Sequence, residues 1–244
     1  MGVHNGVPLS KTLYKEAGIM QKLKIVLNSW SDEYRLIKDI WGDEFPKTDM
    51  YKLSLLEKLI MSLLVFVRSL SAVHLIKFAS SKTLRSQLSE NYVLLWFVAL
   101  ILFLFFPSSG ICTSILIAYR LIDGFNYRLC IVFVDRYKKG WGLRSINRSF
   151  MLLLINYLEM IIGFAALYVY TESIGKPAIT SPWESLYFSV VTITTLGYGD
   201  FSPVNEWGQF LVATQTLMGV VFVMLVVSTF LTGVSGISNL KDGK

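Results

Sequence analysis

One uncharged stretch of 28 residues, from Trp207 to Val234, limits most strongly how this chain can fold. About 20 consecutive apolar residues are enough for a helix to cross the hydrocarbon core of a bilayer. Of the 244 residues in the chain, 53% are hydrophobic, which is too large a share for a soluble domain. We therefore expect an all-α membrane protein in which residues 207–234 form a membrane helix.

The run TITTLGYGD, residues 192–200, lies shortly before this stretch and carries glycines at two alternate positions. Glycine adopts backbone conformations that most side chains forbid, so Gly197 and Gly199 permit an unusual path of the chain. Short glycine loops also form turns or bind phosphates. A loop in which successive carbonyls face one axis can instead replace the water around an ion. The sequence around the loop decides between these alternatives.

The segment from Ser181 to Pro203, SPWESLYFSVVTITTLGYGDFSP, resembles the pore loop of tetrameric potassium channels almost position by position. The resemblance extends over about Phe150 to Val234 and implies an outer helix, a re-entrant pore helix with a selectivity-filter loop, and an inner helix. Leu196 stands where that family usually has valine. The resemblance implies a homotetramer that conducts potassium ions passively, without a cofactor.

The resemblance also assigns the residues of the filter. Potassium ions would be coordinated by backbone carbonyls, supplied by Thr195, Leu196, Gly197 and Tyr198. We expect the Thr195 hydroxyl to join these carbonyls and the Tyr198 side chain to point away from the axis. The expected supports of the filter are Thr194, Gly199, Asp200 and Tyr187. Tyr187 either donates a hydrogen bond to Asp200 or simply packs.

The sequence predicts both ends of the pore helix. Ser181 followed by Pro182 and then Glu184 indicates a capping box with proline at the first helical position. We expect the helix to end at about Thr194. The partial negative charge of that end would favour a cation waiting below the filter.

Gly219 lies 22 residues after Gly197, where the resembling family has its inner-helix hinge. A glycine inside a helix costs about 1 kcal/mol relative to alanine. We therefore expect Gly219 to permit either a bend or a close helix contact. Below it, one helix face carries three valines that would line an apolar cavity able to gate by dewetting: Val220, Val223 and Val227.

The remaining residues predict peripheral elements around this pore. Residues 53–80 have helical periodicity but include Glu57, Lys58 and Arg68, so we expect an interfacial amphipathic helix. Residues 1–52 predict a cytosolic, partly helical segment, either a helix docked on the channel or an element that binds a partner or ligand. The expected domain order is 1–52, 53–80, a peripheral transmembrane hairpin with a basic linker over 81–149, the pore domain over 150–236, and a short cytosolic tail over 237–244.

Charged residues set the expected topology. Residues 136–148 contain five basic residues and no acidic residue, which indicates a cytosolic linker and cytosolic N- and C-termini in a multi-pass protein of the cell membrane. The stretch 111–134 either crosses the bilayer with an internal Arg120–Asp123 pair or breaks near Gly124. Glu159, near the middle of the outer helix, needs a buried partner, for which we predict Arg120 or Arg128.

Composition and motifs argue against other functions. The net charge of +6 arises from basic residues that flank apolar runs, a pattern typical of contact with anionic lipid and not of nucleic-acid binding. The absence of CxxC, HExxH and P-loop motifs argues against an enzyme. The alternatives to a potassium channel are a weakly selective cation channel and a non-conducting membrane protein that interacts with or regulates another channel.

Overall fold

The structure is a computed structural model of the chain, and it describes residues 30–42, 53–71, 82–107, 110–135, 146–175 and 178–242. The chain divides into two compact units, Met1–Ser89 and Glu90–Lys244, and each is described by itself. The described elements are almost entirely helical, which confirms the expected all-α membrane fold.

The first unit contains a helix over residues 30–41 and helix α2, Leu55–Ser69. Helix α2 begins at a capping box, in which Ser54 Oγ accepts from the Glu57 amide and the Glu57 carboxylate accepts from the Ser54 amide at 2.8 Å. A buried ion pair of 2.5 Å joins Arg68 to Glu33 of the preceding helix. Helix α2 ends at Ser69, earlier than the predicted amphipathic stretch, and residues 72–80 lie outside the described part of the chain.

One face of helix α2 presents apolar side chains to solvent, as an interfacial helix requires: Leu55, Leu56, Leu59, Leu63 and Phe66. The helix has 15 residues. At 1.5 Å per residue it is about 22 Å long, which is short for a bilayer core of roughly 30 Å. An interfacial position therefore stays our prediction for this element.

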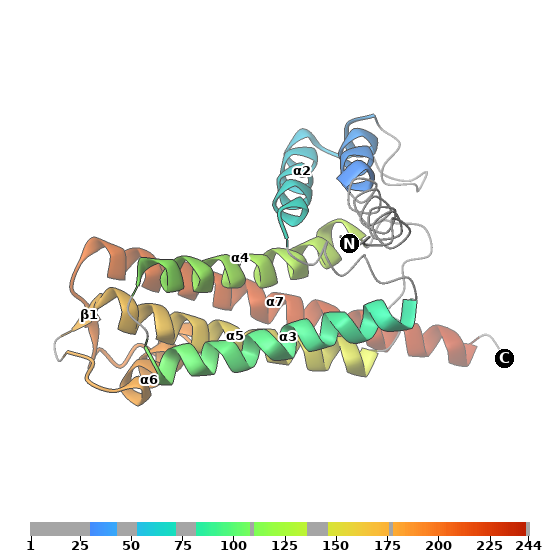
Figure 1. Ribbon diagram of the computed structural model, residues 1–244. Coiled ribbons are helices and arrows are strands. Elements are labelled where there is room, and N and C mark those ends of the chain that lie inside the picture. The colour runs from blue at the N-terminus through green and yellow to red at the C-terminus, as the bar shows by residue number, and fades with distance from the viewer. Residues whose placement is uncertain are drawn as a thin grey trace, which may run out of the picture. The chain divides into compact units, whose positions relative to one another are not determined.

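Helix α3 begins at Lys82, among the last residues of the first unit, and continues into the second. From Lys82 onward, the described residues form five helices and a pair of two-residue strands (Figure 1). In chain order they are α3 (Lys82–Phe105), α4 (Ile111–Phe133), α5 (Ile146–Thr171), β1 (Ile174–Gly175), α6 (Pro182–Ile193), β2 (Ser202–Pro203) and α7 (Glu206–Asp242). Helix α5 contacts α4, α6 and α7. The short helix α6 and strand β1 lie at one end of the long helices in Figure 1.

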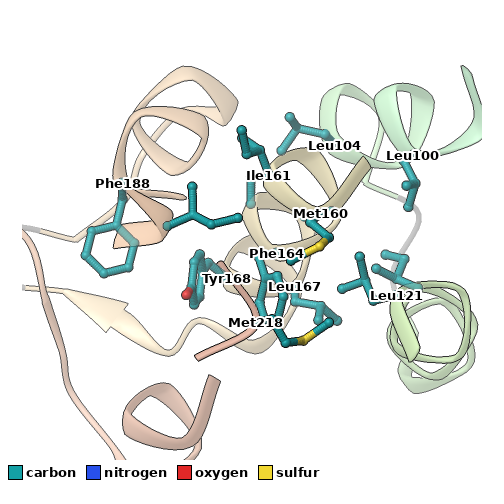
Figure 2. Close-up of a cluster of buried hydrophobic side chains, with 14 of the residues drawn as sticks. Leu100, Leu104, Leu121, Met160, Ile161, Phe164, Leu167, Tyr168, Phe188 and Met218 are labelled. Atoms are coloured by element: carbon teal, nitrogen blue, oxygen red, sulfur yellow. The ribbon is translucent and has the colours of Figure 1, made fainter. Parts of the chain in front are cut away.

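The hydrophobic core of this unit is built around helix α5. Figure 2 shows side chains of α3, α4, α6 and α7 gathered around those of α5. The contributors from outside α5 include Leu100 and Leu104 of α3, Leu121 of α4, Phe188 of α6 and Met218 of α7. Burying such side chains holds the helices together, and helix α5 therefore links the peripheral helices to α6 and α7.

Three of the described helices are long and apolar enough to cross a membrane, over Gln87–Phe105, Arg148–Thr171 and Glu206–Phe230. The first lies in the predicted transmembrane hairpin over 81–149, and the other two coincide with the predicted outer helix and inner helix. Helix α4 does not meet this criterion. It continues through Gly124 as a single helix, so the predicted alternative of a break near Gly124 is wrong. That α4 crosses the bilayer stays a prediction.

A buried ion pair fastens helix α4 to helix α5. Arg120 Nη2 lies 2.5 Å from Glu159 Oε2, and Arg120 Nη1 lies 3.7 Å from Asp123 Oδ2. The Tyr92 hydroxyl of α3 donates to the same Asp123 oxygen at 3.2 Å. The prediction of a basic partner for Glu159 is confirmed, and the partner is Arg120. Charges inside a membrane protein persist where they find such partners.

A buried hydrogen-bond network joins helices α5, α6 and α7. Gln215 of α7, which is 0% exposed, accepts from the Tyr168 hydroxyl of α5 at 2.6 Å. Its Nε2 donates to Ser189 Oγ of α6 at 2.7 Å and to the Ser189 carbonyl at 3.0 Å. Ser189 Oγ in turn donates to the Ile161 carbonyl of α5 at 2.7 Å. These bonds fix the position of α6 between α5 and α7.

Replacing Gln215 by methionine should destabilise the protein, because it leaves the buried Ser189 carbonyl and the Tyr168 hydroxyl without this partner. A buried polar group that loses its partner costs about 1–3 kcal/mol. Thermal unfolding of the purified protein in detergent should show a lowered midpoint. Gln209→Met is the matched control, since Gln209 is exposed on the same helix. Equal midpoints for the two variants would show that the network does not stabilise the fold.

Candidate functional site

The start of helix α6 has the capping box that the sequence predicts. Ser181 Oγ accepts from the Glu184 amide at 3.3 Å, and Pro182 occupies the first helical turn. The Glu184 carboxylate accepts from the Thr180 amide at 2.6 Å and from the Ser181 amide at 3.2 Å. The hydrogen bonds from Thr180 lower the pKa of Glu184. The ionised carboxylate suits the positive end of a helix and fixes where α6 begins.

Helix α6 ends at Ile193 with Thr194 as its C-cap, which confirms the predicted end. The Thr194 hydroxyl donates to the Val190 carbonyl at 2.7 Å. The amides of Thr195 and Leu196 turn back to donate to carbonyls of the last helical turn at 3.0 Å each. The helix terminus is thus closed by the first residues of the loop, which directs the chain into residues 195–199.

The loop backbone alternates between positive and negative φ. Thr195 has φ +59°, Gly197 has +56° and Gly199 has +77°. The two glycines were predicted to take such conformations. Thr195 was not, because a positive φ is uncommon for any residue that carries a Cβ. A Cβ on either glycine would meet no atom within 4 Å in the single chain. Backbone conformation, and not crowding, therefore explains the need for glycine at both positions.

The loop leaves its backbone oxygens unpaired. Among the described residues, none donates a hydrogen bond to the carbonyls of Thr195, Leu196, Gly197 or Tyr198. Residues 194–200 are all exposed in the single chain. Backbone carbonyls that are withdrawn from water need a partner, and these four are available to a cation.

Tyr187 of α6 holds the far end of the loop. Its hydroxyl donates to Asp200 Oδ2 at 2.7 Å, so of the two roles expected for Tyr187 the hydrogen bond is present. The rings of Tyr187 and Tyr198 are stacked, with centroids 6.5 Å apart. Asp200 Oδ1 also accepts from the Phe201 amide at 3.1 Å. The aromatic side chain of Tyr198 is thereby directed onto α6.

Two short strands anchor the chain after the loop. Strands β1 and β2 pair antiparallel, with Ile174 opposite Pro203 and Gly175 opposite Ser202. The Val204 amide extends this pairing by donating to the carbonyl before β1 at 3.0 Å. Sequence patterns did not predict these strands, because two residues are too few to show any periodicity. The pairing ties the exit of the loop to the segment that follows α5.

Gly219 of α7 lies against the C-terminal end of α6. A Cβ at this position would lie 2.7 Å from Ile193 Cγ1 and 2.8 Å from the Ile193 carbonyl oxygen. Of the two explanations expected for Gly219, a bend and a close helix contact, the close helix contact is present. Helix α7 continues through Gly219 without interruption, so the hinge stays a prediction. The cavity lining expected of Val220, Val223 and Val227 also stays a prediction, since all three are exposed in the single chain.

Part of the chain is similar to known ion channels. Residues 153–235 match a family model described as "Ion channel". Two pore potassium channel a of Oryza sativa subsp. japonica is 34% identical over 86 residues, which are 35% of this chain and 25% of that protein. Two pore potassium channel b of the same organism is 37% identical over 91 residues, 37% of this chain and 24% of that protein.

Another similar protein is voltage-gated potassium channel KCNC1 of Mus musculus, 33% identical over 109 residues, 41% of this chain and 21% of that protein. These matches therefore cover about a quarter or less of each relative. No solved structure matches the chain. The family-model match runs from α5 to α7 and includes the site described above.

The contact at Gly219 predicts that Gly219→Ala destabilises the packing of α6 on α7 by about 1–3 kcal/mol, since the added methyl meets a backbone oxygen. Gly163→Ala is the matched control. Its methyl would also lie 2.7 Å from the nearest atom, but that atom is the tip of the Leu121 side chain, which can rotate away. Thermal unfolding should show the larger loss for Gly219→Ala. A loss no larger than that of Gly163→Ala would argue against the contact and favour the hinge.

Proposed function

We propose that this chain is one subunit of a homotetrameric channel that conducts potassium ions passively, because residues 153–235 match an ion-channel family model and the similar proteins are potassium channels. The observation that carries the proposal is the loop of residues 195–199, in which alternating positive φ values accompany four unpaired carbonyls. The potassium ion is the transported species and not a resident cofactor.

In the proposed filter, carbonyls of Thr195, Leu196, Gly197 and Tyr198 replace the water around a potassium ion. Four copies of the chain would supply successive rings of oxygens. Neutral carbonyl dipoles bind a cation without the strong affinity of a carboxylate, so an ion can leave as well as enter. The Tyr187–Asp200 hydrogen bond supports this assignment, because it fixes the residues that follow Tyr198.

A single chain leaves both the carbonyls and a long apolar surface uncovered. Helix α7 exposes large apolar side chains along its length: Trp207, Phe210, Leu217, Val220, Val223, Met224 and Val227. Side chains of this kind, next to a loop that needs several copies to surround an ion, support assembly of four subunits around one axis. In that assembly the valines would line the cavity below the filter.

The orientation that we propose places the linker between α4 and α5 in the cytosol. Residues 136–148 hold five basic residues, and Arg148 at the start of α5 lies 2.5 Å from Glu90 of α3. Charged groups at these helix ends suit the cytosolic boundary of the membrane. The N- and C-termini would then be cytosolic, in the cell membrane, with α4 as a further span. Residues 1–52 remain a candidate site for a cytosolic partner or ligand.

Replacing Gly199 by alanine should abolish conduction or remove the preference for potassium, because alanine disfavours the φ of +77°. The test reconstitutes the full chain in planar bilayers and measures the reversal potential in a potassium/sodium gradient. Gly110→Ala is the matched control. Gly110 precedes α4 in an extended conformation and has room for a methyl group, so this variant should conduct as the unchanged chain does.

An unchanged reversal potential in Gly199→Ala would contradict the filter assignment. A reversal potential near zero for the unchanged chain would identify a weakly selective cation channel. A complete lack of current from the unchanged chain, with intact tetramers present, would favour a non-conducting membrane protein.

A further inference from the structure

Helix α4 contains a buried cation that the proposed conduction mechanism does not use. Arg128 is only 7% exposed, and its Nε has no hydrogen-bond partner. Among the described residues, Arg128 forms no ion pair, and its recorded contact is with the ring of Tyr127 at 5.9 Å. Glu159 and Asp123 are both engaged by Arg120. Withdrawing a guanidinium from water without a partner is costly.

Arg128 lines a cavity of about 40 Å³ between three helices. The other residues around it are Ile131 and Val132 of α4, Ser149 and Leu153 of α5, and Leu225 and Thr229 of α7. A volume of about 10–15 Å³, counted as the space open to the centre of a water-sized sphere, is enough for one water molecule. The cavity can therefore admit the oxygen atoms of one small ionic group beside the guanidinium.

The start of helix α5 adds positive potential to the same cavity. Helix α5 begins at Ile146, so Ser149 lies in its first turn. Amides in the first turn of a helix have no intrahelical acceptor, and the helix dipole is positive there. The Ser149 hydroxyl is a further hydrogen-bonding group in the lining, whereas the Thr229 hydroxyl donates to the Leu225 carbonyl at 2.8 Å. An arginine whose Nε has no partner, a helix N-terminus and a hydroxyl group together suit an anion with several oxygens, such as a phosphate.

The cavity lies at the end of the helices where a phospholipid headgroup would be found. Thr229 lies five residues before Val234, near the C-terminal end of the apolar stretch of α7, and Ser149 follows Arg148, the first residue of the span in α5. Residues 136–148, between α4 and the start of α5, carry five basic residues and no acidic residue. In the orientation proposed above, this level is the inner leaflet of the bilayer.

We propose that this cavity is a binding site for a phosphate group, held by Arg128 and most simply supplied by an anionic phospholipid of the inner leaflet. A bound phosphate would contact α4, α5 and α7 together, and it would thereby link the peripheral helix to the inner helix. Inorganic phosphate offers the same chemistry, and the two sources can be separated by experiment. The proposal uses the orientation of the chain but does not depend on potassium conduction.

Binding can be measured on the purified full chain after removal of lipid in a neutral detergent. Native mass spectrometry would follow titration with dioleoylphosphatidylglycerol, with dioleoylphosphatidylcholine as the neutral comparison and inorganic phosphate as a competitor. Arg128→Gln should weaken phosphatidylglycerol binding by about tenfold to a hundredfold, as expected for the loss of a charge-assisted contact. Ser149→Met should also weaken it, by filling the cavity while the charge remains.

Arg148→Gln is the matched control, because Arg148 is partly exposed and paired with Glu90, and this variant should bind within about twofold of the unchanged chain. If inorganic phosphate at matched concentration displaces phosphatidylglycerol, the site exists and a soluble anion can supply the phosphate group. Lack of competition would support the phospholipid. Equal binding by the unchanged chain and both cavity variants would overturn the proposal, as would equal binding of phosphatidylcholine and phosphatidylglycerol.

Discussion

The proposed function of this chain depends on one constraint, which is that the backbone of residues 195–199 must stay in an unfavourable conformation with its carbonyls unpaired. Among the described residues no hydrogen bond reaches the four carbonyls of this loop, so the elements around the loop must hold its conformation. Helix α6 closes onto the start of the loop, and the Tyr187–Asp200 hydrogen bond holds its end. The strand pair β1–β2 fixes the chain beyond it. The Gln215 network then fixes helix α6 itself between α5 and α7.

The peripheral helices are joined to this assembly by charge as well as by apolar packing. Arg120 of α4 binds Glu159 in the middle of α5, so a change in the position of α4 would act directly on the outer helix. Arg128 lies two turns further along α4 and faces a cavity shared with the inner helix. If a phosphate occupies that cavity, the two arginines hold α4 at two levels, one through a protein carboxylate and the other through a bound anion.

Local patterns in the sequence were sufficient for the features that depend on neighbouring residues. The capping box at Ser181 predicted where α6 begins, and the run of apolar residues after Glu206 predicted α7. The need of Glu159 for a basic partner followed from its place in an apolar helix. Features that depend on tertiary contacts were missed. The positive φ of Thr195 opposes the preference of that residue, and the role of Gln215 depends on side chains 26 and 47 positions away. An amide side chain well inside an uncharged stretch was the available signal for Gln215.

The central claim, that four copies of residues 195–198 bind potassium through backbone carbonyls, is tested most directly by locating the ions. Crystals of the full chain grown with thallium in place of potassium would reveal the ions by anomalous scattering. The account predicts a column of separate peaks on a fourfold axis, each beside carbonyls of Thr195, Leu196, Gly197 or Tyr198 from all four copies. A fourfold assembly with no peaks between these carbonyls, or an assembly that keeps the four loops apart, would contradict it.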